Sequence, residues 1–186
     1  MRFSVVVPTY NRVSTLRQCL KGLLIQDHPD YEIIVVDDGS TDGTAEVLMQ
    51  EFSSIRYFQQ KNAGPAAARN RGLQAATGEI IAFTDDDCLT PPDWLTQLAA
   101  GYIRHSEVAG VGGGLIAPPE ILATNPYAQY ERYIARDVYQ VGEIEALGGF
   151  ECPAGGTANM STANPSWKPS TDLMSRFLWR RAKTRI

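Results

Sequence analysis

The chain has 186 residues, of which 44% are hydrophobic and 20% are charged, and its formal net charge is −4. This length suffices for one α/β domain with a hydrophobic core, and the slightly acidic composition argues against a nucleic-acid-binding protein. No apolar run approaches the roughly 18–20 residues that cross a bilayer, and the N-terminus is too short an apolar stretch for a signal peptide, so we expect a cytoplasmic chain without a transmembrane segment.

Apolar runs alternate with helical patterns along the first part of the chain. Residues 3–7 form a short β-rich run typical of a buried parallel strand. Ser14 is a candidate cap for the next helix, because serine oxygens accept hydrogen bonds from helix N-termini. The apolar stripe of that helix comprises Leu16, Cys19, Leu20, Leu23 and Leu24. A second strand is expected over 31–36, and the polar turn of residues 37–44 leads into a helix over 45–52.

The alternation continues with a weaker third strand over 55–58. Gly64-Pro65 opens an alanine-rich helix that reaches about Ala76, since proline suits the first turn of a helix. A fourth strand is expected over 80–83, and Pro91-Pro92 opens another helix. The expected buried positions of that helix are Trp94, Leu95, Leu98, Ala99 and Tyr102. Residues 108–111 predict a fifth strand.

Beyond about residue 115 the alternation fades. The residues Tyr127, Tyr130, Tyr133 and Ile134 have helical spacing and predict an amphipathic helix. The tail from Asn164 onward is basic, and a frayed, solvated tail is the simpler expectation. Because Arg180 and Arg181 lie near Phe177 and Trp179, peripheral contact with a membrane surface is the alternative.

Strand–helix alternation with short connections predicts an α/β fold, a Rossmann-like, mostly parallel sheet flanked by helices. In such sheets ligands bind beyond the carboxyl ends of the strands. Three polar groups follow predicted strands, at residues 8–11, 37–38 and 85–87. We therefore expect these groups to face one crevice.

The triplet Asp85-Asp86-Asp87 is the strongest candidate for chemistry. Adjacent carboxylates repel one another unless a cation or solvent screens them. Mg²⁺ and Mn²⁺ prefer oxygen ligands and commonly share one or two carboxylates with substrate phosphates. A solvated acidic turn, with Asp87 or Asp93 capping the next helix, is the structural alternative for the triplet by itself.

Two further groups lie where the same crevice is expected. Asp38, after the second strand, can accept hydrogen bonds from a base N–H or a ribose hydroxyl, whereas Asp42 or Thr44 can cap the following helix. Arg69 and Arg71 lie about 200° apart on their helix, so at most one faces the crevice, where it could pair with phosphate. Two surface arginines are the alternative.

Several other sites are excluded by spacing. The run Gly110-Val-Gly-Gly-Gly114 does not have the Gly-x-Gly-x-x-Gly pattern after a first strand and is interpreted as a flexible loop. The cysteines have no Cys-x-x-Cys spacing and the two histidines stand apart, so neither a zinc site nor a Cys–His nucleophile is expected. Reduced, packed thiols are expected instead.

Four ordered motifs resemble family 2 glycosyltransferases of the GT-A fold. They are Val-Val-Pro-Thr-Tyr-Asn-Arg at 6–12, Ile-Ile-Val-Val-Asp-Asp-Gly-Ser-Thr-Asp at 33–42, Asn-Ala-Gly-Pro-Ala-Ala-Ala-Arg-Asn at 62–70 and Gly-Glu-Ile-Ile-Ala-Phe-Thr-Asp-Asp-Asp at 78–87. The resemblance covers roughly residues 3–115. It implies a nucleotide-diphosphate-sugar donor, usually a UDP-sugar, and inverting transfer to an acceptor hydroxyl, with a saccharide or lipid-linked acceptor possible.

The resemblance also implies roles for single residues. It places Pro8, Thr9 and Tyr10 at the base of the nucleotide, and Asp38 with Asp37 at the uracil or ribose. Arg69 is placed near the diphosphate, Asp85 and Asp87 at the metal, and Asp86 in the donor site. The implied cofactor is Mn²⁺ or Mg²⁺, which neutralises charge on the departing nucleoside diphosphate. Residues 1–115 are then the donor-binding half, 116–163 a shortened acceptor-side region and 164–186 an atypical basic tail.

The sequence departs from the family pattern where the catalytic base is expected. Pro169-Ser170 stands in the place of a Glu-Asp pair, so Asp172 is the substitute candidate. A non-catalytic nucleotide-sugar-binding remnant is therefore the alternative function. A nucleotidyltransferase is disfavoured, because Pro8-Thr-Tyr-Asn-Arg12 stands where that class has a glycine-rich phosphate loop.

Overall fold

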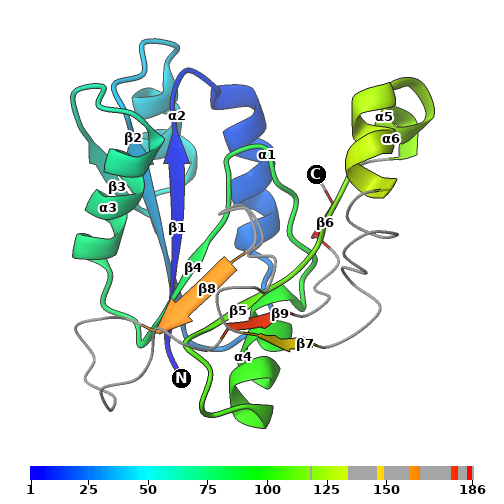
Figure 1. The fold of residues 1–186 in the computed structure, drawn as a ribbon. Coiled ribbons are helices and arrows are strands. Elements are labelled where there is room, and N and C mark those ends of the chain that lie inside the picture. The colour runs from blue at the N-terminus through cyan, green and yellow to red at the C-terminus, as the bar shows by residue number, and fades with distance from the viewer. Residues whose placement is uncertain (118, 134–145, 149–159, 164–176, 180–183, 186) are drawn as a thin grey trace.

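A computed structural model describes residues 1–117, 119–133, 146–148, 160–163, 177–179 and 184–185. In its first part, strands and helices alternate as the sequence predicts (Figure 1). The elements of this part are β1 (Phe3–Thr9), α1 (Val13–Leu23), β2 (Tyr31–Asp37), α2 (Thr44–Glu51), β3 (Arg56–Gln59), α3 (Pro65–Ala75), β4 (Ile80–Phe83), α4 (Trp94–Arg104) and β5 (Gly110–Gly112). The later described elements are β6 (Leu115–Ile116), α5 (Pro119–Thr124), α6 (Pro126–Tyr133), β7 (Ala146–Gly148), β8 (Met160–Ala163), β9 (Phe177–Trp179) and β10 (Thr184–Arg185).

One sheet organises the described residues, with strand order β3-β2-β1-β4-β8-β5-β9-β7. The strands β3, β2, β1 and β4 pair with one another in parallel, whereas β8 runs antiparallel to both β4 and β5. The predicted α/β class with a mostly parallel donor-side sheet is therefore confirmed. The sheet also joins strands from all three predicted segments, because β8 lies within 116–163 and β9 within 164–186.

Strand β1 is buried along its whole length, and its side chains alternate between two layers of helices. Phe3, Val5 and Val7 face the larger core, which α1 and α4 cover, whereas Val6 packs with Leu73 on the α3 side. Figure 1 shows α3 on the side of the sheet away from α1. This two-sided burial explains why the strand is a continuous apolar run.

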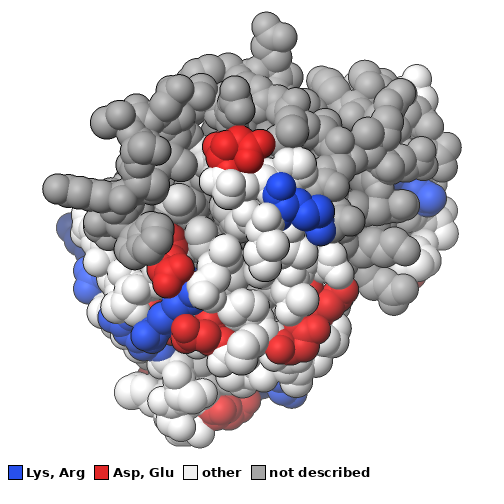
Figure 2. Space-filling view, turned by 90° about the horizontal axis from the view of Figure 1, so that it is seen from below, with Lys and Arg blue, Asp and Glu red and all other residues white. Residues whose placement is uncertain are grey.

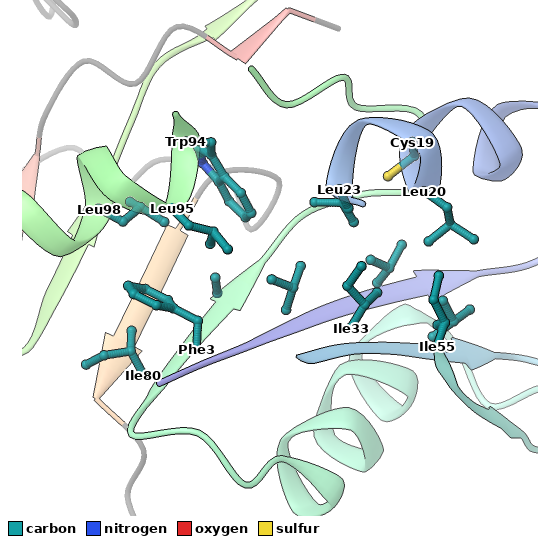
Figure 3. Packing of buried hydrophobic residues seen from close by; sticks show 14 of the residues in the cluster. Phe3, Cys19, Leu20, Leu23, Ile33, Ile55, Ile80, Trp94, Leu95 and Leu98 are labelled. Carbon is teal, nitrogen blue, oxygen red and sulfur yellow. The ribbon is translucent and has the colours of Figure 1, made fainter. Parts of the chain in front are cut away.

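The larger core joins the sheet to α1 and α4. Figure 3 shows Trp94 and Leu95 of α4 and Leu23 of α1 pointing toward Phe3 and Ile80 of the sheet. Trp94 is fully buried and is the largest such side chain among the described residues. All five predicted core positions of α4 are buried, which confirms the 3.6-residue pattern there.

Helix α3 approaches the sheet closely because the residues on its inner face have very small side chains. Its buried residues are Ala68 and Gly72, and a Cβ added at Gly72 would overlap Cγ1 of Val6. Val6 is fully buried at the centre of the sheet and has no room to withdraw. The alanine-rich motif thus sets the distance between α3 and β1.

We predict that Gly72→Ala lowers the free energy of unfolding by about 1–3 kcal/mol, as overpacked cores do. This loss would exceed the gain of about 1 kcal/mol that alanine normally brings to a helix interior. Urea unfolding of a double-mutant cycle with Val6→Ala measures the effect. Gly72→Ala should be much less harmful in the Val6→Ala background, and an equal loss in both backgrounds would refute the steric explanation.

The structure corrects several local predictions. Ser14 does not cap α1; it lies inside the helix, whose first N–H, at Val13, donates to Asp42 Oδ2 at 2.9 Å. Leu24 is 42% exposed and does not belong to the buried stripe. The strand predicted over 108–111 is observed as β5 at Gly110–Gly112. The first three residues of the run 110–114 therefore form a buried strand between β8 and β9, and the flexible loop predicted there is wrong for these three residues.

The C-terminal prediction is also revised. The prediction of a frayed tail is wrong for two segments. Residues 177–179 pair in parallel with β5, and residues 184–185 pair with β6. The predicted helix is observed as α6, but its tyrosines at 127, 130 and 133 are all more than half exposed, so they form no buried face; Ile134 lies outside the described residues. Within the described residues, no helix is long and apolar enough to cross a bilayer.

Glu32 organises the amino end of the sheet. Its Oε1 accepts hydrogen bonds from Ser4 and from the backbone and hydroxyl of Thr77, and its Oε2 accepts one from Arg56 at 2.6 Å. Burial by itself would raise the pKa of Glu32, but these hydrogen bonds lower it to about 2. Figure 2 views this end of the molecule and shows acidic and basic side chains interspersed.

Candidate functional site

The candidate site lies at the opposite edge, where β1, β2 and β4 end side by side. Thr9 and Asp37 are register partners, and the N–H of Asp38 donates to the carbonyl of Thr9 at 2.9 Å. The N–H of Thr84 likewise donates to the carbonyl of Val6 at 3.3 Å. The three polar groups that follow these strands therefore converge on one edge, as the sequence predicts (Figure 1).

Hydrogen bonds join the turn after β1 to the turn after β2. Asn11 has a left-handed φ of 52°, and its N–H donates to Ser40 Oγ at 2.9 Å. The side-chain oxygen of Asn11 accepts from the N–H of Thr41 at 2.8 Å. Together with the bond from Val13 to Asp42, these contacts fix how the chain enters α1.

The side chain of Asp37 is fully buried and binds groups of the protein itself. It accepts hydrogen bonds from the N–H of Ser40 at 2.8 Å, the hydroxyl of Tyr57 at 2.8 Å and the amide of Gln59 at 3.3 Å. Asp37 thereby ties the end of β2 to β3. The donor contact that the resemblance implies for Asp37 stays a prediction.

Asp38 holds the start of α3. It accepts hydrogen bonds from Gln60 Nε2 at 2.7 Å and from the N–H groups of Ala63 and Gly64 at 2.9 and 2.8 Å. Burial opposes ionisation, but these bonds outweigh it and lower the pKa of Asp38 below its usual value. Asp38 therefore positions the helix that carries Arg69.

Arg69 reaches the acidic triplet from α3. Its Nη2 lies 2.6 Å from Asp85 Oδ1, and its Nε is buried without an acceptor in the described part of the chain. Arg71 points elsewhere, with its guanidinium 5.8 Å from the centre of the Phe58 ring. Of the two arginines, Arg69 is therefore the one that contacts the acidic triplet.

Asp86 is the buried member of the triplet. Its Oδ2 accepts a hydrogen bond from the hydroxyl of Thr9 at 2.7 Å, and its Oδ1 lies 3.3 Å from Arg12 Nη1. Burial raises the pKa of Asp86 above its usual value, although Thr9 and Arg12 counteract this effect. Thr9 and Arg12 therefore stabilise the ionised form of Asp86 against the effect of burial.

Asp87 is the accessible member of the triplet. Its side chain is 44% exposed, and its Oδ2 lies 3.0 Å from Nη1 of Arg12, the same nitrogen that contacts Asp86. Two residues predicted to contact the nucleotide base differ in exposure. Pro8 is buried in β1, whereas Tyr10, just beyond the end of β1, is 48% exposed.

The sequence-based predictions give two residues of the site no ligand-binding or catalytic role. Arg12 bridges two members of the triplet, and Asp42, expected at most to cap its own helix, binds the start of α1 as well. The sequence signal for Arg12 is its place as the last residue of the first motif, at residues 6–12. Asp172 lies outside the described residues, so its catalytic role stays a prediction.

Asp85 and Asp87 fit a divalent cation through the chemistry of their oxygens. Mg²⁺ and Mn²⁺ accept one or two protein carboxylates when substrate phosphates and water supply the remaining ligands. The described residues contain no group of three or more candidate metal-binding side chains. A cation held by the triplet would therefore take its remaining ligands from water or from the oxygen atoms of a phosphate-bearing ligand.

Comparison with known proteins adds independent information. The family model described as "Glycosyl transferase family 2" matches residues 4–146. One relative is the "GalNAc(5)-diNAcBac-PP-undecaprenol beta-1,3-glucosyltransferase" of Campylobacter jejuni, which is 43% identical over 91 residues. This match covers 46% of the chain and 29% of the relative.

Solved structures share the fold. The S. aureus protein TarS, solved as residues 1–349 in complex with UDP-GlcNAc, has a TM-score of 0.58 and 31% identity, and the match covers 64% of this chain and 36% of that TarS chain. The mannosyltransferase PcManGT of Pyrobaculum calidifontis has a TM-score of 0.68 and 21% identity over the whole chain, which covers 56% of PcManGT. The chain thus spans only part of the length of each of these proteins.

Proposed function

The chain belongs to glycosyl transferase family 2 and has the GT-A fold, and from this premise we propose that it transfers a sugar from a UDP-sugar to an acceptor hydroxyl. The proposed reaction is metal-dependent and inverting. The observation that carries the proposal is the acidic triplet after β4, which is contacted by Thr9 from β1, Arg12 from the following turn and Arg69 from α3.

The proposed chemistry follows from the charge that develops on the leaving group. The acceptor oxygen forms a bond to the anomeric carbon while the bond to the departing UDP breaks on the opposite face. A bound Mn²⁺ or Mg²⁺ would neutralise charge on the diphosphate, with Asp85 and Asp87 holding it. Arg69 lies beside Asp85 with an unused buried donor, so its guanidinium is suited to pair with phosphate oxygens.

The proposed donor is a uridine nucleotide because TarS, whose structure contains UDP-GlcNAc, is 31% identical to this chain. In the proposal, Pro8, Thr9 and Tyr10 contact the base, and Asp37 and Asp38 contact the uracil or ribose. Asp38 has a second function in either case, since its hydrogen bonds to Ala63 and Gly64 hold the start of α3.

The acceptor is proposed to be a saccharide or a lipid-linked saccharide. The name of the Campylobacter relative describes a lipid-linked substrate of that protein, and this supports the second possibility here. Asp172 is the proposed base that removes the proton from the acceptor hydroxyl. A remnant that binds the donor without transfer remains the alternative, because the usual Glu-Asp pair is replaced by Pro169-Ser170.

Calorimetric titration of the purified chain with UDP tests the donor site. We expect UDP to bind in the presence of Mn²⁺ and to bind at least about tenfold more weakly with EDTA, because the cation links the carboxylates to the diphosphate. UDP-sugars should then raise the melting temperature in a concentration-dependent way.

The outcomes separate the alternatives. Metal-dependent binding with donor hydrolysis or transfer supports the enzyme, whereas binding without either reaction supports the remnant. If UDP does not bind in Mn²⁺, the assignment of the donor site is wrong. GDP serves as the matched nucleotide control, because it carries the same diphosphate with a different base.

A further inference from the structure

Arg12 contacts the last two carboxylates of the acidic triplet. A single nitrogen of its guanidinium, Nη1, lies 3.3 Å from Asp86 Oδ1 and 3.0 Å from Asp87 Oδ2. Among the described residues, Asp85 has a cation of its own in Arg69, at 2.6 Å. The three acidic side chains are thus paired with two guanidinium groups that reach them from different elements.

The backbone of Arg12 is fixed although its side chain is 58% exposed. Its carbonyl accepts the hydrogen bond from the N–H of Leu16 that begins α1, at 3.0 Å. The neighbouring residues Asn11 and Val13 are tied to Ser40 and Asp42. The side chain therefore projects from a rigid turn and can change partners without a movement of the backbone.

The two carboxylates that Arg12 contacts differ in what they need. Asp86 is only 6% exposed, so its charge must be compensated inside the protein. Asp87 is 44% exposed and water solvates it well, so its pair with Arg12 adds little stability. Arg12 is thus required at Asp86 but can be replaced by another cation at Asp87.

We propose that Arg12 is a positioning residue that occupies Asp87 in the donor-free protein and leaves it when the divalent cation and the diphosphate bind together. This inference rests on the proposed function of the site. In the free protein the guanidinium competes with the cation for Asp87. In the complex it stays at Asp86, next to the diphosphate, where its charge favours the bound donor.

Two opposite changes in affinity follow for Arg12→Met. Without nucleotide, Mn²⁺ should bind about tenfold more tightly than to the wild type, because Asp87 no longer has a competing cation. With Mn²⁺ present, UDP should bind about tenfold more weakly, because a positive charge is missing beside the diphosphate. A purely structural defect would weaken both.

Mn²⁺ binding is measured by electron paramagnetic resonance of the free ion, and UDP binding by calorimetry. Arg17→Met is the matched control, since Arg17 is a partly exposed arginine of the adjacent helix α1 that pairs with Glu51. It should change neither affinity. Arg12→Lys keeps the charge and should lie closer to the wild type than Arg12→Met in both measurements.

The nucleotide-free comparison decides the inference. Equal Mn²⁺ affinities of wild type and Arg12→Met, weaker binding by the variant, or no binding by either would overturn it, even where UDP binds normally in Mn²⁺. Failure of the wild type to bind UDP in Mn²⁺ would instead overturn the proposed function. The two failures are thus read from different titrations.

Discussion

Asp87→Asn is expected to weaken metal-dependent UDP binding and sugar transfer by about 100-fold or more, the range seen when an electrostatic group of a reaction site is removed. Asparagine has nearly the same size but lacks the charge that would hold the cation. Because Asp87 is 44% exposed, its loss should change the free energy of unfolding by less than about 1 kcal/mol. Calorimetry with UDP and Mn²⁺, together with urea unfolding, measures both effects.

Asp93→Asn is the matched control for this variant. Asp93 lies six residues beyond Asp87, directly before α4, and is also exposed. Its side chain accepts a hydrogen bond from Gln97. Its replacement should leave UDP binding unchanged. If Asp87→Asn and Asp93→Asn bind UDP equally well in Mn²⁺, the triplet is only an acidic turn and the metal site is refuted.

Trp94→Ala should have the largest effect on stability, a loss of about 3–5 kcal/mol in the free energy of unfolding. The indole is fully buried between α4, α1 and the sheet, so its removal leaves a cavity that the surrounding strands cannot fill (Figure 3). Thermal and urea unfolding measure the loss. Trp94→Phe should be milder, because it retains much of the apolar volume.

Ile103→Ala gives the comparison within the same helix. Ile103 is 76% exposed, so its truncation should change stability by no more than about 0.5 kcal/mol. Comparable losses for Trp94→Ala and Ile103→Ala would mean that α4 is not anchored to the sheet through its tryptophan.

Most of the fold was predictable because it depends on local patterns. The apolar run of β1 and the helical spacing of Trp94 and Leu98 reflect how each element buries itself, and both were identified correctly. The convergence of Asp38 and Asp85 also followed from a general rule, since parallel strands end at the same edge.

The remaining features depend on contacts between distant turns. Asp42 contacts the start of α1 from the turn after β2, so the local signal of Ser14 was misleading. Arg12 reaches Asp86 across 74 positions of the chain, and no periodicity encodes that contact. A strand was predicted over 108–111, but the glycine run that follows it was interpreted as a loop. The strand partners β8 and β9, which come much later in the sequence, extend β5 to Gly112.

The position of β8 has a consequence for how the protein is made. β8 lies between β4 and β5, and Phe83 pairs with Met160, 77 positions later (160 − 83). At a synthesis rate of roughly 5–20 residues per second, the edge of β4 waits roughly 4–15 s for its partner on the ribosome. An unpaired strand edge is open to other chains, so the nascent protein passes through an aggregation-prone interval that ends only when residues 160–163 emerge and join the sheet.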